Sequence, residues 1–343
     1  FDAPQIGTFL HYLLESVTRD VLAQGGFAAV DNDRLHQLVR QYIDQYVAGE
    51  LHNFQNRSAR FRYLFRRLRT TAYAVIDQVA EELRHSDFVP MAFELTFGGK
   101  DGALPAVTIS QPGGQLRVGG KVDRVDGWIK DNKLYIRVVD YKSGKKKFDL
   151  ANVRMGLDIQ MLLYLFALQK EGKQYFGRDI EPAGVLYLPA RDEILSLDRN
   201  VTPEDLKKER EKTLKRSGLL LDEPEVLQAM EHEAMTEPRY LPLRVNRSGD
   251  LSGSIASAAQ LGKLGNYVDK LLRQIAGELR GGNIDADPCC HSEEDSQCRF
   301  CDWAPACHFR DGQDRDHLRY ILPVKPEEFW QELEEGGGDP WQN

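Results

Sequence analysis

The stretch 118–144 constrains the fold most strongly, because it predicts two paired strands that both carry charged residues. Positions 134–142 are rich in β-branched and aromatic residues, which predicts a strand. The polar segment 130–133, Lys-Asp-Asn-Lys, predicts a turn that folds this strand back on the one at 116–126. We therefore expect a strand–turn–strand unit here.

Charged side chains gather at one end of this unit. Because side chains alternate along a strand, Asp140 and Lys142 are predicted to point to the same face, and Asp123 can lie across from Asp140. Two carboxylates and a lysine suit hydrolysis of a phosphodiester, since carboxylate oxygens hold Mg²⁺ and an ammonium steadies negative charge or orients water. The alternative is an exposed hairpin with ordinary surface charges, which a lone D-x-K triplet does not exclude.

Helical and strand patterns alternate along the first 190 residues. The order is helix, three strands, helix, strand, which predicts an α/β fold with an αβββαβ core and a mixed central sheet flanked by helices. The predicted helices lie at 4–22, 31–85 and 153–169, the strands at 91–97, 116–126, 134–142 and 184–188, and further helices at 202–216, 218–235 and 254–280. Positions 98–114 are expected to be a connection without regular structure.

Four short motifs resemble those of the PD-(D/E)XK nucleases, specifically the RecB-like branch. GxxDRxD occupies 120–126, and DYKSG occupies 140–144. Gly7-x3-His11-x3-Glu15 is similar to the helix that supplies a metal-binding histidine in that branch, and Gln160-x3-Tyr164 is similar to its further motif. The resemblance implies a restriction-endonuclease-like core and a Mg²⁺-dependent deoxyribonuclease.

The resemblance also implies a metal site. His11, Asp123, Asp140 and the carbonyl group of Val139 would hold Mg²⁺ or Mn²⁺, and Lys142 would assist the attacking water.

Two further motif positions complete the implied site. Gln160 and Tyr164 would position the substrate or Lys142. Arg124 would either pair with a carboxylate as a structural residue or contact a phosphate.

Six arginines fall between positions 57 and 69, interleaved with three aromatic residues. Arginine pairs with phosphate and stacks on bases, so the segment could guide a DNA strand, with Arg62 and Arg66 as candidate contacts. A solvated helix face whose aromatic residues lie in the core is an equally good interpretation.

All five cysteines lie between Cys289 and Cys307, which favours a metal site and a reducing, cytoplasmic setting over a disulfide framework. Cys298, Cys301 and Cys307 form C-x2-C-x5-C, a spacing open to Zn²⁺ or an iron–sulfur cluster.

This segment resembles the C-terminal [4Fe–4S] motif of the AddB proteins of AddAB-type helicase–nucleases. In that family a fourth cysteine lies far upstream, but no cysteine precedes Cys289 here. Because the chain begins with Phe, we expect it to be a piece of a longer protein that holds the fourth ligand. Otherwise Cys289, Cys290 or His291 completes the site.

The 343 residues are expected to form one nuclease domain at 1–322, with its core at about 1–190, helical additions and the cysteines at about 200–322, and an acidic tail at 323–343 that includes a helix. A net charge of −8 argues against nonspecific coating of nucleic acid but permits local DNA contacts. No apolar run is long enough to cross a membrane.

No G-x4-G-K-[ST] motif occurs, so an ATP-driven motor would lie in an AddA-like partner protein. The resemblance implies an exonuclease or endonuclease for single-stranded DNA in double-strand-break repair and recombination. Alternatives are a CRISPR-associated RecB-like iron–sulfur exonuclease and a non-catalytic DNA-binding scaffold, although a scaffold has no chemical need for Asp123, Asp140 and Lys142.

Overall fold

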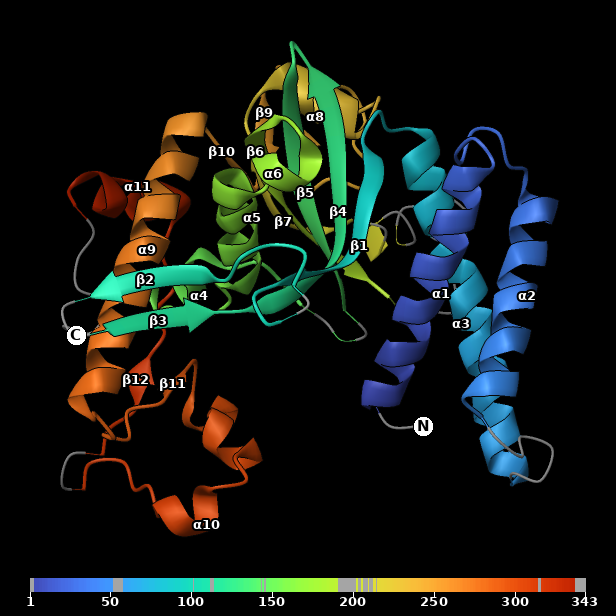
Figure 1. Cartoon of the computed structure of the whole chain (residues 1–343). Helices are drawn as coiled ribbons and strands as arrows, with labels where there is room; N and C mark the ends of the chain where they lie inside the picture. Colours follow the sequence, from blue (N-terminus) through green and yellow to red (C-terminus); the bar gives the residue numbers. More distant parts are fainter. Residues whose placement is uncertain are drawn as a thin grey trace.

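A six-stranded mixed sheet lies at the centre of the molecule (Figure 1). The computed structural model describes residues 3–51, 58–100, 102–111, 114–142, 144, 146–190, 202, 205, 209, 212–213, 215–313 and 316–336. The sheet has the order β1-β4-β5-β6-β7-β10. Its strands are β1 (Val89–Phe97), β4 (Gly120–Lys130), β5 (Lys133–Lys142), β6 (Asp179–Pro189), β7 (Ser217–Leu221) and β10 (Ile255–Ala256). The pairs β5–β6 and β7–β10 are parallel and the other pairs antiparallel, which confirms the predicted mixed sheet.

The hairpin β4–β5 forms as predicted. Asp131 and Asn132 connect the strands with positive φ angles of 48° and 64°, which is the backbone of a two-residue turn that matches the twist of the strands. Residues with short polar side chains tolerate this conformation best after glycine. The turn fixes the register in which Arg124 lies opposite Val139.

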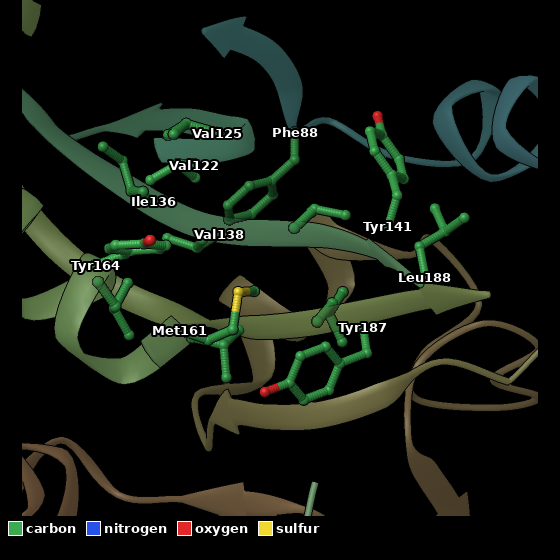
Figure 2. Close-up of a cluster of buried hydrophobic side chains, with 14 of the residues drawn as sticks. Phe88, Val122, Val125, Ile136, Val138, Tyr141, Met161, Tyr164, Tyr187 and Leu188 are labelled. Atoms are coloured by element: carbon green, nitrogen blue, oxygen red, sulfur yellow. The ribbon is translucent and has the colours of Figure 1, made fainter. Parts of the chain in front are cut away.

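Helices cover both faces of the sheet. Figure 2 shows Met161 and Tyr164 on one side of β5 and Tyr141 on the other. Met161 and Tyr164 belong to α5 (Gln160–Glu171), and the side of Tyr141 is covered by α1 (Ala3–Ala23) and α3 (Ala59–Arg84). The remaining helices around the sheet are α2 (Asn32–Gly49), α4 (Leu150–Arg154), α6 (Lys173–Phe176), α8 (Pro224–Met230) and α9 (Ala258–Gly281).

Several element boundaries differ from the predictions. The helix expected at 153–169 is interrupted where Gly156 and Asp158 take positive φ angles of 76° and 56°, so α4 and α5 are separate. The expected connection at 98–114 contains β2 (Val107–Gln111), which pairs with β3 (Gly114–Val118) as a second hairpin. The helix expected at 31–85 is two helices, and the helix expected at 218–235 is β7 followed by α8. Most of the helix expected at 202–216 lies outside the described residues.

The C-terminal region contains short elements around α9. The acidic segment after position 322 contains a helix, α11 (Pro326–Glu334), as expected, and its Phe329 and Trp330 are buried in the main core. The other elements are β8 (Leu243–Val245), β9 (Leu251–Gly253), β11 (Cys289–Cys290), β12 (Arg319–Tyr320), α10 (Ala304–Cys307) and two short 3₁₀ helices at Glu293–Asp295 and Gln297–Phe300. Within the described residues, no helix combines the length and apolar character that crossing a membrane requires.

Candidate metal centre and nuclease site

The two motif aspartates meet at one end of the β4–β5 hairpin. Arg124 pairs with Val139, so the next positions along each strand, Asp123 and Asp140, lie across from each other. Asp123 Oδ2 accepts a hydrogen bond of 2.9 Å from the backbone N–H of Tyr141. Strand pairing therefore fixes the position of the Asp123 carboxylate.

His11 of α1 lies over this end of the hairpin. Its Nδ1 is 3.6 Å from Asp123 Oδ1, and its Nε2 is 3.3 Å from the carbonyl oxygen of Tyr141. The carbonyl group beside His11 is thus that of Tyr141, whereas Val139 lies within the ladder opposite Arg124. The structure brings His11 beside Asp123, and the role of the Val139 carbonyl as a metal ligand stays a prediction.

Glu94 of β1 is a third acidic residue at the site, which the motifs did not identify as a ligand. Its carboxylate oxygen is 3.7 Å from His11 Nδ1, and it forms an ion pair with Lys121. Its φ angle of 51° is unusual for a residue other than glycine, and such strained backbone occurs preferentially at functional sites. The only sequence signal was a carboxylate inside an otherwise apolar strand.

The environment perturbs the titration of all three groups. Burial, together with the charges of Asp140 and Glu94, raises the pKa of Asp123 to about 6, although His11 acts in the opposite direction. Burial lowers the pKa of His11, but Glu94 and Asp123 outweigh this and leave it above 6.5. The contacts with His11 and Lys121 hold the pKa of Glu94 below its usual value. The two carboxylates therefore differ: Glu94 is stabilised in its charged form, whereas burial disfavours the charged form of Asp123.

These residues fit a divalent cation. One potential ligand atom from each of His11, Glu94 and Asp123 lies within 4.8 Å of the other two, and within the described part of the chain no other such group of His, Cys, Asp or Glu is found. Two carboxylates and an imidazole suit Mg²⁺ or Mn²⁺, and a carbonyl oxygen adjoins them. A bound cation would also offset the burial and the neighbouring negative charges that raise the pKa of Asp123.

Asp140 and Lys142 form the second part of the site. Lys142 Nζ is 2.7 Å from Asp140 Oδ2, which shows that the two side chains share a face as predicted. Asp140 is nearly buried, whereas Lys142 is half exposed. Lys142 therefore extends from the buried carboxylate toward solvent.

Gln160 and Tyr164 contact each other rather than Lys142. The amide of Gln160 donates to the hydroxyl of Tyr164 at 3.0 Å, and this hydroxyl accepts from the backbone N–H of Lys121 at 3.3 Å. Tyr164 also stacks on Phe97, with ring centroids 5.7 Å apart. The pair holds α5 against the strand that carries Asp123.

Arg124 is buried, which corrects the expectation of a phosphate contact. Its side chain is fully inaccessible, is 2.8 Å from Asp126 and donates to the hydroxyl of Tyr141 at 3.1 Å. Arg137 bridges Asp126 and Glu82, at 2.9 and 3.4 Å. Arg124 therefore has the structural role that was its alternative.

The exposed arginines lie on α3. Arg62 and Arg66 are exposed, whereas Phe65 between them is buried. Arg57 falls outside the described residues. The alternation supports both earlier interpretations, an aromatic residue in the core and arginines free to contact a strand.

Cys289 and Cys290 form β11, Cys298 lies in a 3₁₀ helix, Cys301 directly follows that helix, and Cys307 ends α10. Cys290 is buried, Cys289 and Cys298 are half-buried, and Cys301 and Cys307 are exposed. No three of them bring their sulfur atoms within 4.8 Å of one another in the part of the chain that the structure describes. The iron–sulfur cluster stays a prediction.

Comparison with known proteins places this geometry in a family. The profile of the PD-(D/E)XK nuclease superfamily matches residues 1–308. Curated proteins that are named as the B-type subunit of an ATP-dependent helicase/deoxyribonuclease match almost the whole chain. They are 28% identical over 97% of this chain in Thermoanaerobacter sp. (strain X514), 31% over 95% in Acetivibrio thermocellus and 30% over 98% in Clostridium perfringens.

This chain spans only 29–30% of the length of those relatives. The predicted resemblance to AddB proteins of helicase–nucleases and the predicted fold class are confirmed. With the match over residues 1–308 and the sheet-end cluster of His11, Asp123, Asp140 and Lys142, the chain belongs to the PD-(D/E)XK nuclease superfamily.

Proposed function

We propose that this chain hydrolyses phosphodiester bonds of single-stranded DNA as the Mg²⁺-dependent exonuclease domain of a helicase–nuclease. The convergence of His11, Glu94 and Asp123 with the Asp140–Lys142 pair at one strand end carries the proposal. The relatives' name pairs a deoxyribonuclease with an ATP-dependent helicase, which supports an AddA-like partner and a role in double-strand-break repair.

His11 Nδ1, Glu94 and Asp123 would hold the cation, with Asp140 beside them, while the Tyr141 carbonyl would orient the ring by accepting a hydrogen bond from His11 Nε2. There Mg²⁺ would act as a Lewis acid that stabilises the charge developing on the phosphate. For this purpose His11 must be neutral, so that one ring nitrogen can serve as a ligand.

Lys142 would orient the attacking water and stabilise negative charge from the solvent side. Its ammonium group is held by Asp140 at 2.7 Å, so it has a defined position before substrate arrives. Gln160 and Tyr164 would act indirectly, because their hydrogen bonds fix the backbone of Lys121, two residues from Asp123.

We also propose that Cys298, Cys301 and Cys307 bind a [4Fe–4S] cluster together with a ligand outside this chain. The support is their spacing and the similarity to the curated helicase/deoxyribonuclease relatives. Anaerobic purification of this chain and of a longer one, with iron and sulfide analysis, tests this. Full iron content only in the longer chain is expected, and stoichiometric zinc in both would contradict the proposal.

A cleavage assay tests the nuclease proposal. The folded chain should degrade end-labelled linear single-stranded DNA with Mg²⁺ and not with EDTA, and should spare circular single-stranded DNA if it acts from an end. Lys142→Ala should lower the rate about 100-fold or more, as loss of a residue that handles protons does. Cleavage that persists in EDTA, or in folded Lys142→Ala at the original rate, would contradict the assignment.

A further inference from the structure

A cavity of about 430 Å³ lies at the carboxyl ends of the parallel strands β5 and β6. Lys142 at the end of β5 and Pro189 at the end of β6 both line it. Because Lys142 also pairs with Asp140, the cavity is contiguous with the candidate nuclease site. The space beyond the carboxyl ends of parallel strands is where open α/β sheets usually bind ligands.

The wall of the cavity continues the face that carries Asp140. Tyr187 lies opposite Asp140 in the β5–β6 ladder, and Ser217 lies opposite Tyr187 in the β6–β7 ladder. Residues opposite each other share a face of the sheet. A strand of DNA whose cleaved phosphate lies beside the cation that Asp123 would hold could therefore pass Lys142 and enter the cavity.

The lining of this cavity is basic. Of the described residues that line it, none is Asp or Glu. The cationic ones are Lys142, Lys146, Lys147, Lys212, Lys215 and Arg216. The whole chain has a net charge of −8, so the cavity is a local positive patch on a protein that is negatively charged overall.

Only part of this charge is neutralised by acids around the cavity. Four of the six cationic side chains form ion pairs: Lys142 with Asp140, Lys146 with Asp158, Lys212 with Glu209 and Arg216 with Glu82. Lys147 is exposed and forms no ion pair within the described part of the chain. The Lys215 ammonium donates to the Leu243 carbonyl, and burial lowers its pKa. An anion bound here would compensate the remaining charge.

We propose that this cavity is a subsite for the sugar–phosphate backbone of single-stranded DNA beside the cleaved bond, with Lys147 and Lys212 as its phosphate contacts. The inference rests on the proposed function. Phe148, which is half-buried in the lining, adds an aromatic surface on which a base stacks with little sequence preference. Charge and stacking suit a nuclease that reads no sequence.

Binding measurements in EDTA test the subsite without cleavage. Fluorescence anisotropy with a labelled oligothymidylate, over a range of KCl concentrations, gives the slope of log K against log[salt]. Lys147→Ala and Lys212→Ala should each weaken binding and reduce the slope by about 0.7, the value for one phosphate contact on a single strand. Lys147→Glu should weaken binding further.

Lys133→Ala is a matched control. Lys133 is exposed at the opposite end of β5 and paired with Glu181, as Lys212 is paired with Glu209. Nine residues of strand place it roughly 30 Å from Lys142. The Lys133→Ala variant should bind the oligothymidylate with the affinity and the salt slope of the unmodified chain.

Competition identifies the ligand. An unlabelled oligothymidylate should displace the probe at far lower phosphate concentration than inorganic phosphate does, whereas equal potency per phosphate would assign the cavity to a free anion and overturn the proposal. Unchanged slopes in both lysine variants would also overturn it, even if Mg²⁺-dependent cleavage is intact. Loss of the proposed function itself would appear differently, as a folded chain that does not cleave DNA.

Discussion

The two faces of the β4–β5 hairpin carry the same kinds of charge in opposite surroundings. On one face Asp123 and Asp140 retain 12% and 10% side-chain exposure and lie beside half-exposed Lys142. On the other, Arg124, Asp126 and Arg137 are completely buried. One seven-residue motif thus has two roles: its first aspartate belongs to the reactive face, and its arginine and second aspartate hold the hairpin against α3.

The buried face contributes strongly to the stability of the fold. Glu82 of α3 joins Arg137 to Arg216, whose Nη2 is 2.8 Å from Glu82, so the ionic cluster links α3, both strands of the hairpin and the residue that precedes β7. Removing one member of a buried ionic cluster leaves an uncompensated charge, which typically costs about 3–5 kcal/mol. The reactive face, which water reaches, has no such dependence.

Asp123→Asn tests the reactive face and carries the largest expected effect. Loss of a carboxylate ligand removes several kcal/mol of charge stabilisation, which corresponds to roughly a 1000-fold lower cleavage rate. The free energy of unfolding should change by less than about 1 kcal/mol. Rate measurements and urea denaturation check both. A folded variant that retains most of its activity would contradict the catalytic role of the reactive face.

Glu82→Gln tests the buried face. We expect a loss of about 3–5 kcal/mol in the free energy of unfolding, because Arg137 and Arg216 lose their shared counter-charge. Glu81→Gln on the exposed side of the same helix is the control, with little change. Equal stability of the two variants in urea would show that the cluster is dispensable.

The same stability should depend on pH. Burial raises the pKa of Glu82, but Arg216 and Arg137 outweigh this and depress it below its ordinary value of 4.5. A carboxyl group whose pKa is depressed in the folded state stabilises the fold at pH values above its unfolded-state pKa. This contribution is lost as the pH falls through the folded-state pKa. The stability difference between the unmodified chain and Glu82→Gln should therefore be full at pH 7 and narrow progressively below about pH 4.5. A constant difference down to pH 3 would contradict this.

Glu94→Gln asks whether Glu94 belongs functionally to the reactive face. Its place in the β1–β4 ladder and its contact with His11 predict about 10- to 100-fold weaker metal binding, with the fold retained. Calorimetric titration with Mn²⁺ measures this directly. Glu181→Gln provides the comparison, because Glu181 pairs with Lys133 at the opposite end of β5 and should leave metal affinity unchanged.

Arg62→Ala and Arg66→Ala should have the smallest effect. If these exposed arginines of α3 contact phosphates, each loss reduces the salt slope of single-strand binding by about 0.7. An unchanged slope in both would assign them to the solvated face of α3, the alternative that the sequence left open.

Strand alternation explains which parts of the site could be predicted. It correctly placed Asp140 and Lys142 on one face, and applied to neighbours Asp123 and Arg124 it would have placed Arg124 away from the substrate. Glu94 could not be found in this way, because its position depends on the β1–β4 register and on its own strained backbone. The short strands β7 and β10 were missed since their pairing is set by distant partners rather than by local pattern.

The fold, too, has elements that could be predicted from local sequence and elements that could not. The hairpin and α1 were predictable from periodicity and turn chemistry, whereas the break between α4 and α5 was not. Met161, Leu165 and Leu168 continue a helical pattern backwards across Gly156 and Asp158, which take left-handed backbone angles. Local chain geometry outweighed the apolar pattern there.

Gly120 and Tyr164 compete for one volume. A β-carbon built at position 120 would lie 2.6 Å from Cε1 of Tyr164 and closer still to its hydroxyl, so the tyrosine occupies the space that any other side chain there would need. Among related sequences, a larger residue at position 120 should therefore occur together with a smaller one at position 164. The two motifs, forty-four residues apart, would then be inherited as a single unit.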